Sequence, residues 1–126
     1  MEDTPISFDV IVNQDDANNE NIDRLTRNLY KELRELDIEN VNLKTEKSPD
    51  GTKSDELVTI GAILLTTLPV TLPAIIQWLQ AWSIRDKRNS IKIRKQVGKK
   101  TIEIEISDST SPEILKEYIK LLENSI

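Results

Sequence analysis

Two tryptophans and a group of basic residues form the part of this sequence whose composition and spacing best fit a binding surface. Trp78 and Trp82 lie four residues apart, which would place both side chains on one face of a helix. Tryptophans at the centre of protein interfaces often carry much of the binding energy, and charged residues surround them at the rim. We therefore predict that Trp78 and Trp82 bind a partner, with Arg85, Lys87 and Arg88 as a charged rim.

The sequence offers little for catalysis. Its 126 residues include no His and no Cys, so the commonest general base, thiolate nucleophiles and Cys-based metal sites are excluded. The three glycines, Gly51, Gly61 and Gly98, lie too far apart to form a phosphate-binding loop. We expect no enzymatic activity, no catalytic residues, no metal site and no cofactor.

Charge is distributed unevenly along the chain, which has 22 acidic and 17 basic residues and a net charge of -5. Eight basic residues fall within 85–100, against the single acidic residue Asp86. This block would suit an acidic partner or anionic lipid, or its residues would stabilise a helix end and pair across a hairpin. Because the chain is acidic and no aromatic residue interrupts the block, we expect no nucleic-acid partner.

An uncharged run of 28 residues, 57–84, precedes the basic block. Its length exceeds the roughly 20 residues that span a membrane, and the two tryptophans followed by basic residues resemble an interfacial belt. Pro69, Pro73 and four threonines interrupt the run, which favours a buried helix pair or a surface for self-association. A homo-oligomer is therefore expected, and a membrane-anchored or pore-forming component remains the alternative.

The first residues bear on localisation. Met1, Glu2 and Asp3 are followed by no apolar segment of the kind found in signal peptides. We therefore expect a cytoplasmic protein, and membrane association through 57–84 is the alternative.

Hydrophobic periodicity predicts the elements that hold these residues. Alternating apolar residues predict one strand at 6–12 and another at 39–44. Leucines and isoleucine at spacings of three and four predict an amphipathic helix over 20–37. Strand, helix and strand in this order suggest a right-handed crossover between parallel strands.

The uncharged run is predicted to be helical throughout. We expect one helix at about 55–67 and a second at about 73–87, joined by a turn at the prolines, or a single kinked helix. A polar loop at 45–54, with a Pro-Asp-Gly turn signal, comes before it. Both versions make 57–84 an apolar central helical segment.

Two alternating segments, 90–96 and 101–106, predict a β-hairpin. Gly98 takes the first central position of a type II′ turn between them. In that register two oppositely charged pairs lie across the strands, Lys92 with Glu105 and Arg94 with Glu103.

The last predicted element is a helix at 111–124, with Ser111 as N-cap and Pro112 at its first position. The complete order is β-α-β-α-α-β-β-α. We therefore expect an α+β fold in a single domain, 1–126, with helices packed on a four-stranded mixed sheet.

The order of these segments resembles the small α+β family called effector-associated constant component. The resemblance covers about residues 6–123. It depends on Ile22-Asp23-Arg24-Leu25 to Leu36, Ser54-Asp55-Glu56-Leu57, Trp78-Leu79-Gln80-Ala81-Trp82 leading into Arg85 to Arg88, the hairpin turning at Gly98, and Ser111-Pro112-Glu113. The chain differs from the family in its central run, which is rich in Leu, Ile and Thr instead of Gly and Ala.

This resemblance implies a function. Such proteins look like the invariant, non-catalytic partner in bacterial conflict systems that act against invaders such as phages. The implied partners carry effector-associated domains, trypsin-like or caspase-like peptidases, or NTPases. The family supplies no catalytic residues, so the implied function is that of a non-enzymatic adaptor or regulatory component.

Overall fold

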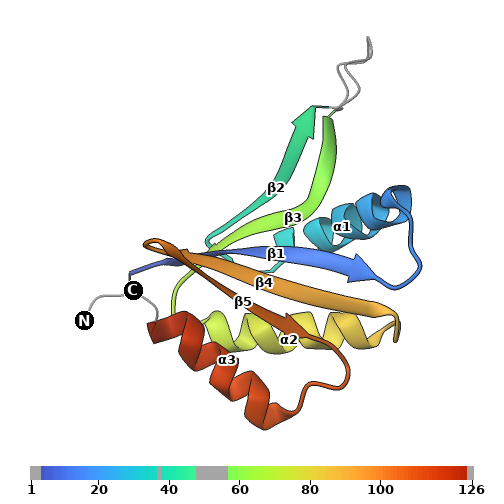
Figure 1. Ribbon diagram of the computed structural model, residues 1–126. Coiled ribbons are helices and arrows are strands. Elements are labelled where there is room, and N and C mark those ends of the chain that lie inside the picture. The colour runs from blue at the N-terminus through green and yellow to red at the C-terminus, as the bar shows by residue number, and fades with distance from the viewer. Residues whose placement is uncertain (1–3, 37, 48–56, 125–126) are drawn as a thin grey trace.

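The computed structural model describes residues 4–36, 38–47 and 57–124 (Figure 1). Within these ranges the chain forms five strands and three helices, so the predicted α+β class is confirmed. In chain order the elements are β1 (Ile6–Gln14), α1 (Asn19–Arg34), β2 (Asn40–Lys47), β3 (Leu57–Thr67), α2 (Leu72–Ile84), β4 (Asn89–Val97), β5 (Lys100–Ile106) and α3 (Pro112–Asn124).

The strands form one antiparallel sheet in the order β2-β3-β1-β4-β5. The predicted four-stranded mixed sheet is therefore wrong in both the number and the direction of its strands. β1 and β2 point the same way, as the crossover prediction requires, but β3 lies between them and runs antiparallel to both. This arrangement places β1 at the centre of the sheet and leaves β2 and β5 at its edges.

The additional strand is β3, where the sequence predicts a helix at 55–67. Ile63 and Leu65 are fully buried toward the helices, whereas Leu64 between them is half-buried on the other face. An uninterrupted apolar run has no period and does not distinguish a buried helix from a buried strand, but its many Val, Ile and Thr residues favour the strand. The uncharged run 57–84 is therefore a strand followed by a helix, which corrects the apolar central helical segment.

The hydrophobic core lies between one face of the sheet and the three helices. β1 buries four alternate residues from Ile6 to Val12, and its Val10 sits in register between Ile63 of β3 and Ile93 of β4. α1 packs on β1, β2 and β3, while α2 packs on β4, β5 and α3 (Figure 1). Alternation along each strand thus directs the apolar residues to the same side, where the helices cover them.

The opposite face of the sheet displays paired charges to solvent. Lys44 of β2 lies 3.0 Å from the Asp9 carboxylate of β1, and Arg94 of β4 lies 2.8 Å from the Glu103 carboxylate of β5. Ion pairs as exposed as these contribute little stability each, roughly 0–1 kcal/mol. This open face is a mixed, solvated surface, and the side chains predicted to bind a partner lie in the helical layer.

The predicted hairpin is confirmed as β4 and β5. The two charge pairs are in register as predicted, Lys92 opposite Glu105 and Arg94 opposite Glu103. Gly98 has a φ of 62°, and Lys99 is not among the residues with positive φ, which is the backbone pattern of a type II′ turn. Glycine is required here because L side chains rarely adopt this conformation.

Side-chain caps fix the beginnings of α1 and α3. The Asn18 side chain accepts a 2.8 Å hydrogen bond from the Asn21 amide, and Ser111 accepts one of 3.2 Å from the Ile114 amide. The helices predicted at 20–37, 73–87 and 111–124 are therefore confirmed, with earlier ends for the first two. Most of the polar loop predicted at 45–54 lies outside the described residues.

Candidate partner-binding site

Helix α2 carries both tryptophans and contributes heavily to the core. It begins after the turn at Pro69, and Pro73 occupies its first turn, where the missing amide donor does no harm. Its buried apolar residues recur with helical spacing on the face that packs against the sheet: Leu72, Ile75, Ile76, Leu79 and Trp82. Most of the apolar character of this helix is therefore used inside the protein.

The two tryptophans occupy different environments. Trp82 is 4% exposed and belongs to the core, whereas Trp78 is half-buried at the border of the core. Residues four apart on a helix point about 40° away from each other, which is enough to separate a core position from a border position. The structure therefore leaves Trp78 within reach of a partner and places Trp82 among the side chains that hold α2 in place.

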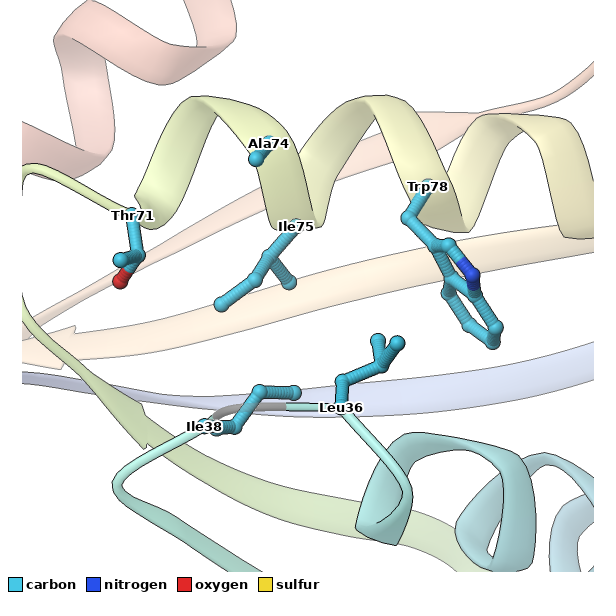
Figure 2. Close-up of a pocket in the computed structure, with 6 residues that line it drawn as sticks. All are labelled: Leu36, Ile38, Thr71, Ala74, Ile75 and Trp78. Atoms are coloured by element: carbon cyan, nitrogen blue, oxygen red, sulfur yellow. The ribbon is translucent and has the colours of Figure 1, made fainter.

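Trp78 lines an open, apolar groove of about 200 Å³ beside α2 (Figure 2). The turn between α1 and β2 forms the opposite wall, where Leu36 points toward Trp78 and Ile38 lies near the Thr71 end. The lining residues are Leu36, Ile38, Thr71, Ala74, Ile75 and Trp78. The sequence places Leu36 on the apolar face of the helix predicted at 20–37 and Ile38 just after it, but no local pattern indicates that the two line a groove with Trp78.

The predicted basic rim lies where α2 ends and the chain turns into β4. Arg85 reaches across to α1, where its guanidinium lies 2.9 Å from the Glu32 carboxylate, and the Arg85 side chain remains 57% exposed. Lys87 is exposed in the turn itself. Arg85 therefore follows the C-terminal end of α2, beyond Trp78, while the groove itself extends from Trp78 toward Thr71 and Ile38.

Arg88 is engaged locally. Its guanidinium lies 2.8 Å from the Asp86 carboxylate, and its backbone carbonyl accepts a hydrogen bond from the Asp15 amide. The side-chain and backbone donors of Arg88 hold the pKa of Asp86 at about 2, below its usual 3.8. This arrangement ties the turn before β4 to the end of β1, so Arg88 organises the loop in addition to contributing charge.

Replacing Arg88 with glutamine is expected to raise the pKa of Asp86 from about 2 part of the way to 3.8, because the Arg88 backbone donor remains. Because the folded state favours the ionised form of Asp86, this carboxylate stabilises the folded protein above pH 3.8. The stabilisation is lost as the pH falls through 2. A carbon-detected NMR titration of the Asp86 carboxyl measures this directly. Arg94→Gln is the control, and an Asp86 pKa still near 2 in Arg88→Gln would show that the guanidinium is not the cause.

The exposed face of α2 carries no charge over its whole length. It consists of Ala74, Gln77, Ala81 and Ile84, and Val70 extends it into the preceding turn. Val70 is 78% exposed and Ile84 is 53% exposed, the two most exposed large hydrophobic residues in the described part of the chain. The sequence indicates this exposed face only as part of an uncharged run with helical spacing. The predicted binding surface is based on the tryptophans instead, and Trp78 lies on a neighbouring face of the helix.

No protein-family model, no curated protein and no solved structure matches this chain. In the three described segments, none of the helices combines the length and the apolar character needed to cross a bilayer. The candidate site is accordingly defined by what the fold exposes: the groove with Trp78, the uncharged face of α2, and Arg85 at its end.

Proposed function

We propose that this protein is a non-enzymatic adaptor or regulatory component of a bacterial anti-invader system, and that it acts by binding other proteins through the surface of α2. The observation that carries the proposal is the uncharged exposed face of α2 beside the groove that Trp78 lines. Resemblance to the effector-associated constant component family supplies the biological setting. The partners in that setting are effector, peptidase or NTPase proteins.

The physical basis is the composition of this surface. Stable interfaces have an apolar centre with aromatic anchors and a polar, charged rim. Trp78 offers a half-buried aromatic ring at the groove, and Arg85 offers an exposed guanidinium at the C-terminal end of the same helix. Trp82 supports this surface from inside the core instead of contacting the partner.

The alternative function, a membrane-anchored or pore-forming component, would need the apolar side chains of 57–84 on the outside of the protein. Ile63, Leu65, Ile76 and Leu79 are fully buried. We therefore expect the native protein to leave membranes during an alkaline carbonate wash. Retention in the washed membranes would instead favour the alternative.

Trp78→Ala is expected to abolish most of the protection that the protein gives its native host against phage. Truncating an interface anchor costs roughly 2 kcal/mol or more of binding free energy, about 30-fold in affinity. Protection is measured as plaque formation on strains that carry the wild-type protein, the variant or a deletion.

Tyr30→Ala is the matched control for this experiment. Tyr30 is also a half-buried aromatic residue at the border of the core, and it lies on the side of α1 opposite Glu32, away from α2. This variant should retain protection. Full protection by a folded Trp78→Ala protein would contradict the proposed binding surface, and equal plaque counts for wild type and deletion would contradict the defence function.

A further inference from the structure

The exposed face of α2 has nearly the same chemistry read in either direction. From Val70 to Ile84 it runs large apolar, alanine, glutamine, alanine, large apolar, with Gln77 at the middle. A two-fold axis at Gln77 would place Val70 of one copy opposite Ile84 of another and bring Ala74 close to Ala81. The small alanines permit close helix approach, and the two central amides can hydrogen-bond to each other.

Charges at the two ends of this face are also complementary. Arg85 lies at the end where α2 meets Glu32. Exposed Glu39 follows Ile38, which lines the groove beside Thr71 at the opposite end. When two copies pack antiparallel along α2, Arg85 of each copy approaches Glu39 of the other. Opposite charges therefore face each other at both ends of the interface.

We propose that a second copy of this chain occupies the exposed face of α2 and forms an antiparallel, two-fold symmetric dimer. This proposal rests on the proposed function, because it names the first partner of that surface. Self-complementarity about a two-fold axis is what an isologous interface requires. In the dimer, Ile84 of the second copy covers the Val70 and Thr71 end of the groove.

The dimer is expected to be reversible. A helix of 13 residues is only about 20 Å long, so α2 and the adjoining groove wall form an interface at the small end of the specific range. The mass should therefore rise with protein concentration from 14.4 kDa toward twice that value. Sedimentation equilibrium over roughly 1–500 μM, the range of weak interfaces, measures this change.

Ala81→Glu should hold the protein at the monomer mass at every concentration, because it places a carboxylate on each side of the axis. Asn42→Glu introduces the same charge on the open face of the sheet and should leave the dimer unchanged. A wild-type protein that stays monomeric throughout, or a folded Ala81→Glu protein that still dimerises, would overturn the proposal.

A charge exchange tests the antiparallel arrangement itself. Arg85→Glu and Glu39→Arg should each weaken the dimer, because each leaves like charges facing at both ends. An equimolar mixture of the two variants should recover it as a heterodimer, because each end then pairs opposite charges. Loss of the internal Arg85–Glu32 contact cannot be repaired by a second protein. Absence of recovery in the mixture would therefore overturn this arrangement.

The outcomes separate this inference from the proposed function. A monomeric wild-type protein whose Trp78→Ala variant loses phage protection would overturn the dimer and leave the adaptor function standing. The opposite outcome is a dimeric wild-type protein whose folded Trp78→Ala and Ala81→Glu variants both protect fully. This result would support self-association and contradict the adaptor function of this surface.

Discussion

Replacing Trp82 with alanine is expected to lower the free energy of unfolding by about 3–5 kcal/mol. Trp82 is 4% exposed, so its removal leaves a large cavity between α2 and the sheet that the packed surroundings fill only in part. A domain of ordinary stability, about 5–15 kcal/mol, would retain only a narrow margin or unfold. Urea unfolding followed by circular dichroism measures this change.

Trp78→Ala provides the comparison on the same helix. Because Trp78 is half-buried, we expect a loss of only about 1–2 kcal/mol. The two substitutions thus distinguish a core tryptophan from a border tryptophan four residues away. Equal losses of stability would contradict the different environments described above.

The second large effect concerns adjacent residues of β3. Ile63→Lys is expected to prevent folding, because it puts an unpaired ammonium group at a fully buried position and costs more than about 4–5 kcal/mol. Leu64→Lys should change stability by only about 1 kcal/mol or less. Leu64 lies on the open face of the sheet in register with Asp9, so the new lysine faces an opposite charge.

Thermal unfolding and proton NMR dispersion of the two variants are the decisive measurements. Alternation between neighbouring residues is the property of a strand, because successive side chains point to opposite faces. In a helix at 55–67, Ile63 and Leu64 would point about 100° apart, and the two lysine substitutions would differ less in their effect on stability. Two unfolded variants, or two stable ones, would contradict the position of β3 in the sheet.

Local signals in the sequence were sufficient for several elements. Gly98 and the opposite charges across the hairpin define the register of β4 and β5, because turn type and cross-strand pairs act over short distances. Ser111 and Pro112 mark the start of α3 for a similar reason. The sequence does not indicate β3 as a strand because its open-face residues, such as Ala62 and Leu64, are as uncharged as its core residues, so it lacks the alternation that is typical of a strand with one solvated face.

The candidate site was predictable only in part. The sequence places Arg85 and Lys87 in the last turn of the helix predicted at 73–87, whereas α2 ends at Ile84 and both residues lie just beyond it. The separation of Trp78 from Trp82 depends on how far α2 is rotated about its axis against the sheet, and helical spacing alone leaves that rotation undefined. Leu36 and Ile38 reach the groove because the turn after α1 lies opposite α2, a tertiary relationship that no local pattern encodes.

The central position of β1 has a consequence for how the protein folds. Among the described strands β1 is the first to be synthesised, yet its two neighbours, β3 and β4, come from later in the chain. Asp9 lies opposite Arg94 in the register of β1 and β4, so this contact at the middle of the sheet joins residues that are separated by more than half the chain. Such distant pairings slow folding, because chain entropy is lost before contacts compensate for it. During translation, β1 and α1 therefore leave the ribosome well before the sheet that will bury them can be completed.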